Sequence, residues 1–256
     1  MLGSIYALIA LGYTMVYGIL RIINFAHGDI LMVGALTTLS GMNALNAHFP
    51  NLPPLAQLGL ALLLAMAVCA LLAMAIERFA YRRLRNAPRL APLISGIGVS
   101  VLLQTVAMIV WSRNPLMFPQ ILPMDPIAVT HGSAAHPPAL VTVTGIVTVA
   151  LALAVMLGLW LLVEYTRLGR GMRAVAENPR IATLMGVNPN AIIALTFAIG
   201  GIFAALAGVM MASNYGSAGF SMGFLPGIKA FTAAVLGGIG NIRGGKSLNA
   251  GQKAHR

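Results

Sequence analysis

The sequence is short of charged residues, which occupy only 8% of its 256 positions. Soluble domains carry about 25% charged residues, because these side chains keep the surface of a folded domain in contact with water. Hydrophobic residues fill 59% of the positions, and the mean hydropathy is +0.87. This composition excludes a soluble globular protein and indicates a membrane protein.

Residues that supply reactive or metal-binding groups are also scarce. Cys69 is the only cysteine and lies in an apolar run, so a disulfide framework or a cysteine-based metal site within one chain is excluded. We expect Cys69 to be a packing residue. The acidic residues show no paired-carboxylate spacing, and no HExxH motif is present; the five acids are Asp29, Glu77, Asp125, Glu164 and Glu177. We therefore expect no catalytic residue, no metal site and no enzymatic activity.

Two strings match enzyme motifs but lack the surroundings that those motifs need. Residues 240–247, GNIRGGKS, fit the P-loop pattern, which requires a preceding strand, a following helix and an acidic residue further on. No acidic residue follows Glu177. Residues 219–223, GFSMG, fit the nucleophile elbow, which needs an acid and a histidine downstream, but only His255 follows. We reject both motifs and expect this chain to bind no cofactor.

Long uncharged runs dominate the sequence, and a helix that crosses a bilayer needs about 20 apolar residues. The first run lacks a basic start and a cleavage site, so we interpret it as a span and not as a signal peptide. Segment 48–54, with three prolines, divides the second run. The runs are Met1–Leu20, Ile30–Ile76, Leu90–Ser112, Ala139–Val163, Ala191–Gly227 and the shorter Ala230–Ile242. They predict an all-α, polytopic transmembrane helical bundle with six full spans and one short one.

Positive charge is abundant but concentrated. The formal net charge is +11, and arginines cluster in segments 77–89 and 164–190. In segments 42–54 and 113–138 the only lysine or arginine is Arg113. Because cytoplasmic loops carry an excess of basic residues, we expect 77–89 and 164–190 to be cytoplasmic. The arginines then contact anionic membrane lipid, and no nucleic acid partner is expected. The proline-rich segment 113–138 is expected to be an extracytoplasmic loop without regular helix.

Polar residues interrupt the apolar sequence at NFAHGD, residues 24–29. Asn24, His27 and Asp29 lie beside Gly28, between the first and second spans. One interpretation is a cytoplasmic turn anchored by Arg21. The other is a helix break that lines a solute path, since polar groups at membrane depth are tolerated where they face protein or a cavity. The residues favour neither interpretation over the other.

The basic segment 164–190 contains signals for a short helix. Asn178 and Asn188 are each followed by proline, and asparagine can cap a helix that has proline at its first position. Gly186 is placed to end the first helix in a left-handed conformation. The spacing thus predicts a short helix over Pro179–Met185. Its apolar stripe, next to Arg180, consists of Ile181, Leu184 and Met185. Such a helix either docks on a partner or forms a surface turn between two spans.

Several stretches together resemble the branched-chain amino acid ABC transporter permeases, most closely the permease of the high-affinity leucine/isoleucine/valine importer. The resemblance covers nearly the whole chain to Ile242. The matching stretches are SIYALIALGYTMVYGILRIINFAHGDILMVGA (4–35), ERFAYRRLR (77–85), LISGIGVSVLLQ (93–104), GRGMRAVAENPRIATLMGVNPNAIIALTFAIG (169–200) and GFLPGIKAFTAAVLGGIGNI (223–242). The resemblance implies a multi-pass subunit of the bacterial inner membrane that imports branched-chain amino acids.

The resemblance also implies partners: a second, similar permease, two cytoplasmic ATPase subunits that use ATP, and a periplasmic binding protein. In ABC importers a permease loop with the pattern E-A-A-x-x-x-G docks into the ATPase. Ala182 and Gly186 match its second alanine and glycine, whereas Arg180 and Ile181 replace its first two residues. The candidate coupling residues are Arg173, Glu177, Asn178, Pro179, Arg180, Ala182, Leu184 and Gly186. The candidate path residues are Asn24, His27, Gly28 and Asp29.

Alternatives remain open for the transported solute and for the mode of transport. A related permease for urea, short amides or another small solute would share the same stretches. A stand-alone channel or secondary transporter would leave the short cytoplasmic helix unexplained. We expect a permease domain over residues 1–242 and a disordered, basic tail over 243–256. Members of the family usually continue beyond the point where the likeness ends, so we expect that this chain does not by itself support transport.

Overall fold

The computed structural model describes residues 2–20, 22–85, 87–88, 90–121, 126–128 and 140–237. The tail 243–256 and the string at 240–247 lie outside these residues. Six helices in the described part are long and apolar enough to cross a membrane, and they confirm the six full spans. With 19 to 27 residues each they measure about 28 to 40 Å at 1.5 Å per residue. They are α1 (Leu2–Leu20), α2 (His27–His48), α3 (Pro54–Ile76), α4 (Leu90–Val110), α5 (Val143–Tyr165) and α8 (Pro189–Tyr215).

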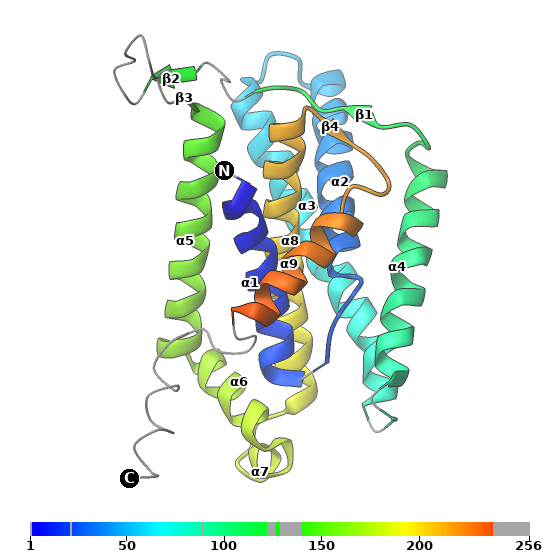
Figure 1. Ribbon diagram of the computed structural model, residues 1–256, viewed down its shortest axis with the longest axis vertical. Helices are drawn as coiled ribbons and strands as arrows, with labels where there is room; N and C mark the ends of the chain where they lie inside the picture. The colour runs from blue at the N-terminus through cyan, green and yellow to red at the C-terminus, as the bar shows by residue number, and fades with distance from the viewer. Residues whose placement is uncertain are drawn as a thin grey trace.

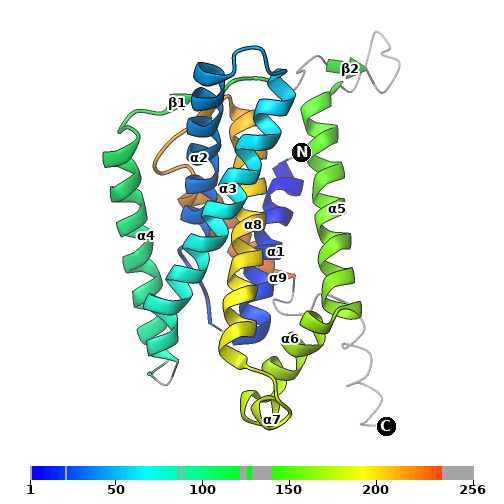
Figure 2. The same cartoon turned by 180° about the vertical axis from the view of Figure 1, so that it is seen from behind.

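The centre of the bundle is α8, which packs against α1, α2 and α3 (Figures 1 and 2). Small residues let the backbones come close here. A Cβ at Gly208 would overlap the carbonyl of Leu31 in α2, and a Cβ at Gly201 would overlap the carbonyl of Cys69 in α3. Cys69 is fully buried, as expected of a packing residue. This contact between small residues is the usual way in which membrane helices approach each other.

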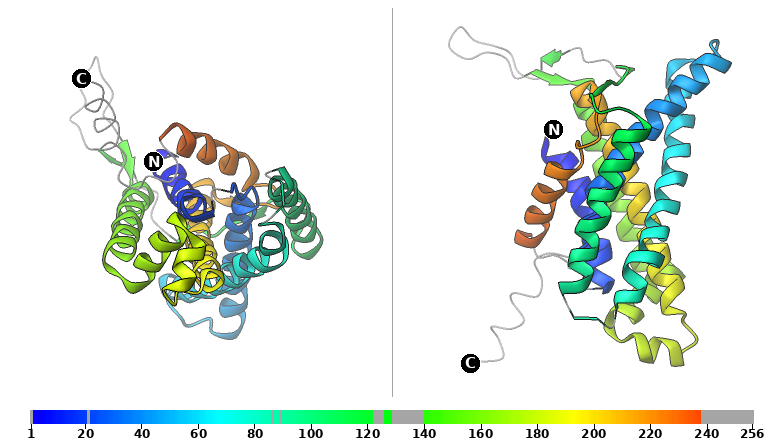
Figure 3. Two further views of the ribbon diagram at one scale, coloured as in Figure 1. Left: turned by 90° about the horizontal axis from the view of Figure 1, so that it is seen from below. Right: turned by 90° about the vertical axis from the view of Figure 1, so that its right-hand side faces the viewer.

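Two flanking helices, α4 and α5, lie on opposite sides of the bundle (Figure 3). Their outer faces expose large apolar side chains, among them Ile109 in α4 and Leu153 in α5. Exposed apolar faces of this length suit contact with lipid hydrocarbon, because a polar face there would lose its hydration. The apolar core is therefore formed by α1, α2, α3 and α8, with α4 and α5 completing the membrane-spanning part.

The connections differ between the two ends of the bundle. At one end lie the α3–α4 connection, α6 (Arg167–Glu177) and α7 (Pro179–Leu184). At the other end β1 (Leu116–Met117) pairs antiparallel with β4 (Ser217–Ala218), and β2 (Pro126–Ala128) with β3 (Leu140–Thr142). The described part of the proline-rich segment contains no helix, as predicted. Both arginine-rich segments lie at one end, which agrees with the charge asymmetry of the sequence (Figure 1).

Two boundaries differ from the expectations. The chain stays helical past Ile76, first as a π-helix over Glu77–Tyr81 and then as a 3₁₀-helix over Arg82–Leu84, so the inter-span segment is shorter than 77–89. The short span begins at Phe224 and not at Ala230, as α9 (Phe224–Leu236). Pro226 is tolerated there because the first turn of a helix needs no N–H donor. The charge of Lys229 does not end the helix because this side chain is exposed.

Candidate functional site

The short helix α7 is held at both ends by local hydrogen bonds. At its start the side-chain oxygen of Asn178 accepts from the backbone N–H groups of Arg180 and Ile181, at 3.0 and 3.2 Å. At its end Gly186 adopts a left-handed φ of 81°. The Gly186 N–H donates to the carbonyl of Thr183 and the Val187 N–H to that of Ala182, both at 3.0 Å. These two bonds form a Schellman motif, which satisfies the last carbonyls of a helix.

The preceding helix, α6, is fixed to the end of α5. Thr166 caps α6 by accepting from the Gly169 N–H at 3.0 Å. A Cβ at Gly169 would overlap the carbonyl oxygens of Leu162 and Val163, so only glycine allows this crossing. Arg173 reaches back to α5, donates to the carbonyl of Val163 and pairs with the Glu164 carboxylate at 3.6 Å. Arg173 therefore positions α6 and does not point away from the protein.

The outer surface of α7 is apolar and exposed. Ala182 is buried, with 2% of its surface exposed, and anchors the helix on the bundle. The exposed fractions of Ile181, Leu184 and Met185 are 57%, 85% and 79%. We call these three residues the α7 apolar surface. The remaining coupling candidates, Glu177, Pro179 and Arg180, are exposed beside it. An exposed apolar surface on a rigid helix at the end of a membrane bundle is suited to docking on a protein partner.

The second candidate region lies inside the bundle, where α2 begins. His27, its first residue, contacts Gly12 in the middle of α1, and a Cβ at Gly12 would overlap the imidazole. His27 Cε1 would also lie 3.9 Å from a Cβ at Gly200, near the middle of α8. Figure 1 shows that the chain climbs from the end of α1 to this level without forming a helix. The NFAHGD segment thus lies inside the bundle between α1 and α2, which favours the interpretation as a helix break over that as a cytoplasmic turn. That it lines a solute path stays a prediction.

The polar side chains of this break are buried among polar groups of other helices. The side-chain oxygen of Asn24 accepts from the Tyr81 hydroxyl at 3.0 Å and from the Ala26 N–H at 3.2 Å. Asp29 Oδ1 accepts from the Gln104 amide at 3.0 Å. His27 Nε2 and Asp29 Oδ2 have no hydrogen-bond partner among the residues that the structure describes. Buried polar atoms without a partner are rare and often mark a functional position.

A backbone contact joins the start of α2 to the start of α9. A Cβ at Gly28 would lie 3.2 Å from the Gly227 Cα and would overlap the Gly223 carbonyl oxygen. A Cβ at Gly223 would in turn overlap the Gly28 carbonyl. Two helix N-termini, each with the positive end of its dipole, therefore meet within the bundle. This arrangement resembles the broken helices that line solute sites in membrane transporters.

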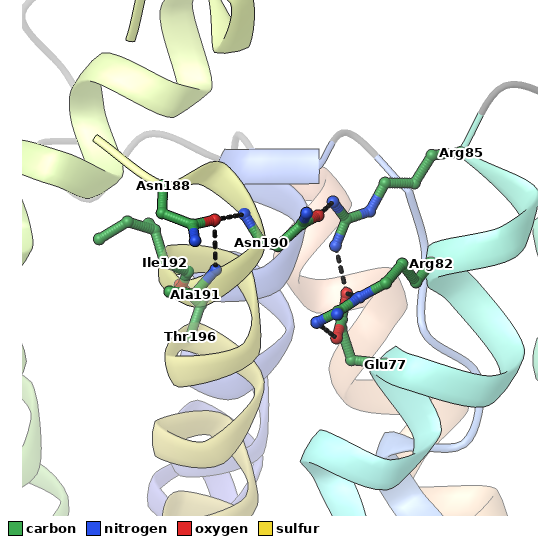
Figure 4. A network of polar contacts seen from close by, with 8 residues as sticks. All are labelled: Glu77, Arg82, Arg85, Asn188, Asn190, Ala191, Ile192 and Thr196. Carbon is green, nitrogen blue, oxygen red and sulfur yellow. Dashed lines mark hydrogen bonds and ion pairs between the residues drawn. The ribbon is translucent and has the colours of Figure 1, made fainter. Parts of the chain in front are cut away.

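A third polar cluster lies at the arginine-rich end and was not predicted from the sequence (Figure 4). Glu77 is fully buried and forms ion pairs with Arg82, at 2.8 Å, and with Arg85. Arg85 also donates to the Asn190 side chain at 2.7 Å. Burial lowers the pKa of Arg85, and the charge of Glu77 opposes this shift. The sequence signal for this cluster is a single acid, Glu77, among the arginines of segment 77–89. Those arginines are predicted from the sequence to contact lipid, and no partner is predicted for Glu77.

Comparisons with known proteins identify the family of the chain. The family described as the permease component of branched-chain amino acid transport systems matches residues 1–245. The chain is 43% identical to the high-affinity branched-chain amino acid transport system permease protein BraD of Pseudomonas aeruginosa, over 94% of this chain and 78% of that protein. It is 41% identical to LivH of Escherichia coli, a protein with the same description, over 95% and 78%. No solved structure matches the chain.

Proposed function

Because the chain belongs to the permease family of branched-chain amino acid transport systems, we propose that it carries branched-chain amino acids across the bacterial inner membrane as a subunit of an ABC importer. The family as a whole works with ATPase and substrate-binding partners, and the chain is a multi-pass protein of the inner membrane. We further propose the composition of the complex: this chain, a second homologous permease, two cytoplasmic ATPase subunits and a periplasmic binding protein. ATP is used by the ATPase subunits.

The observation that carries this proposal is the α7 apolar surface at the arginine-rich end. Leu184 and Met185 expose most of their surface, while Asn178 and Gly186 fix the helix that presents them. Exposed leucine and methionine side chains lose unfavourable contact with water when an ATPase covers them. Closure of the ATPase subunits then pushes on α7. The bundle converts this push into a change of access to the solute path.

The proposed path passes the break at the start of α2. This break includes Asn24, His27, Gly28 and Asp29, of which His27 contacts the middle of α1 and Gly28 the start of α9. The unpaired atoms His27 Nε2 and Asp29 Oδ2 provide one donor or acceptor and one acceptor. Such groups suit the ammonium and carboxylate of an amino acid, whose aliphatic side chain can contact the surrounding apolar residues.

Docking is tested by purifying the ATPase together with this chain and with two variants of Gly186. Gly186→Pro cannot adopt a φ of 81°, so we expect the ATPase to be lost. Gly186→Asn is the matched control, because asparagine tolerates the left-handed conformation, and we expect it to retain the ATPase. Equal recovery with both variants would contradict docking through α7 and would favour a stand-alone channel or secondary transporter.

The solute is tested separately, with the binding protein that works with this chain. We expect the purified binding protein to retain leucine, isoleucine or valine in preference to other small solutes. Isothermal titration with leucine, valine and urea measures this preference directly. Preference for urea or a short amide would replace the proposed substrate while leaving the proposed import mechanism intact.

A further inference from the structure

The π-helix Glu77–Tyr81 is linked to both candidate regions. Its last residue, Tyr81, bonds directly to Asn24, whereas its first residue, Glu77, reaches the start of α8, next to α7, through Arg85. We propose that this π-helix transmits the position of α7 to the helix break at residues 22–26. The inference rests on the proposed docking of an ATPase at α7. It assigns Glu77, Tyr81, Arg85 and Asn190 as positioning residues, because they act through their neighbours and do not contact solute or ATP.

The first contact joins the π-helix to the coupling segment. Asn190 is the second residue of α8, and it follows Gly186, which ends the α7 region, by only four positions. The N–H of Asn190 donates to the side chain of Asn188 at 3.0 Å, so the start of α8 is held rigidly. Arg85 bonds to the Asn190 side chain and pairs with Glu77 (Figure 4). A displacement of α7 therefore reaches Glu77 through two charged or polar contacts.

The second contact joins the π-helix to the helix break. Tyr81 lies one turn after Glu77 and is also fully buried. Its hydroxyl donates to the Asn24 side chain at 3.0 Å, and its ring lies 5.6 Å from that of Phe197 in α8. Gly96 in α4 leaves room for the hydroxyl, since a Cβ there would lie 2.5 Å from it. Movement of the π-helix thus displaces the hydrogen-bond partner of Asn24.

Towards the end of α1, polar contacts and not tight apolar packing position the residues that follow the π-helix, whereas Tyr81 itself packs against Phe197. A cavity of about 490 Å³ separates the α3–α4 connection from the end of α1; it is lined by residues such as Tyr17, Leu20, Leu84, Arg85 and Leu93. Close packing would transmit a displacement directly, but here a gap intervenes. One buried carboxylate, that of Glu77, pairs with two guanidinium groups, those of Arg82 and Arg85, so the cluster has a net positive charge. π-helical turns of this kind are frequent at functional positions.

The test uses a reporter cysteine at the break, Ile22→Cys, in the complex of this chain with its ATPase. Cys69, the only native cysteine, is buried and gives a low background. A water-soluble maleimide labels the reporter with and without ATP. We expect ATP to change the labelling rate. Tyr81→Phe and Asn190→Ala each remove one hydrogen bond of the link, and we expect each to reduce the ATP response about two- to tenfold.

Matched controls and a double variant make the test specific. Tyr165→Phe and Asn43→Ala alter exposed residues outside the link, and we expect them to keep the full ATP response. In the double variant the ATP response should fall no further than in the more strongly affected single variant, because both hydrogen bonds belong to one link. Losses that multiply, an unchanged response in either single variant, or no ATP response in the reference chain would overturn the link. Co-purification of the ATPase is recorded in parallel, and its loss from the reference chain would overturn the proposed docking as well.

Discussion

At the scale of single residues, the contact between Gly28 and Gly223 sets how closely α2 and α9 approach. Gly223→Ala places a Cβ against the Gly28 carbonyl, and backbone atoms cannot rotate away as a side chain can. We expect a loss of stability of about 1–3 kcal/mol, typical of overpacking, measured by thermal unfolding in detergent. Gly158→Ala is the control, since nothing lies within 4 Å of its Cβ. Equal stability of both variants would disprove this close approach.

Individual polar residues stand out in the sequence by their positions, but their partners do not. The sequence marks Asn24, His27 and Asp29 because polar residues are rare in an apolar chain. Their partners lie far away in sequence: Tyr81 is 57 residues from Asn24, and Gln104 is 75 from Asp29. Nothing in the local pattern of a span distinguishes a glutamine that faces a buried carboxylate from one that faces another helix. Only the packing of α4 against α2, and of the π-helix against the segment before α2, brings these groups together.

At the scale of elements, α7 depends on its first cap. Asn178→Ala removes two hydrogen bonds to the helix start and should cost about 1 kcal/mol. We expect hydrogen exchange of the amides in 182–187 to become about fivefold faster, because this free energy governs local opening. Asn188→Ala is the control: it should accelerate exchange at the start of α8 and leave α7 unchanged. If the amides of 182–187 exchange at the same rate in the Asn178 variant as in the unsubstituted chain, the packing of Ala182 alone holds α7.

The elements themselves followed from two kinds of sequence signal. Uncharged runs predicted the spans, because membrane helices must present apolar surface to lipid. The Asn-Pro starts and Gly186 predicted α7, because capping is decided by neighbouring residues. The π-helix has no such signal. Charged residues begin directly after the apolar run, at Glu77 and Arg78, and charged residues usually mark the end of a span. Glu77 pairs with Arg82 and Arg85 further along the same segment. The tertiary contacts of this segment, from Tyr81 to Asn24 and from Arg85 to Asn190, join residues 57 and 105 positions apart.

At the scale of the whole molecule, the charge asymmetry predicts which end of the bundle faces the cytoplasm. The α3–α4 connection and α7 lie at the arginine-rich end, and the α2–α3 connection lies at the other (Figure 1). Cysteines introduced at Ala87, Thr183 and Asn51 fall in these three segments, in that order. We expect a membrane-impermeant maleimide to label Asn51→Cys in intact cells, and the other two only after the membrane is opened. Labelling of Thr183→Cys in intact cells would reverse the orientation and exclude docking of a cytoplasmic ATPase at α7.

The meeting of Gly28 and Gly223 also sets an order for synthesis of the protein. The two glycines are 223 − 28 = 195 residues apart, and ribosomes add about 5–20 residues per second. The start of α2 therefore waits about 10–40 s before its partner leaves the ribosome. Asn24 and Asp29 gain their partners Tyr81 and Gln104 earlier in that interval, whereas Gly28 stays without Gly223 until the start of α9 is made. Insertion of the early spans thus produces an intermediate in which the start of α2 lacks the backbone contact with Gly223 that it has in the finished protein.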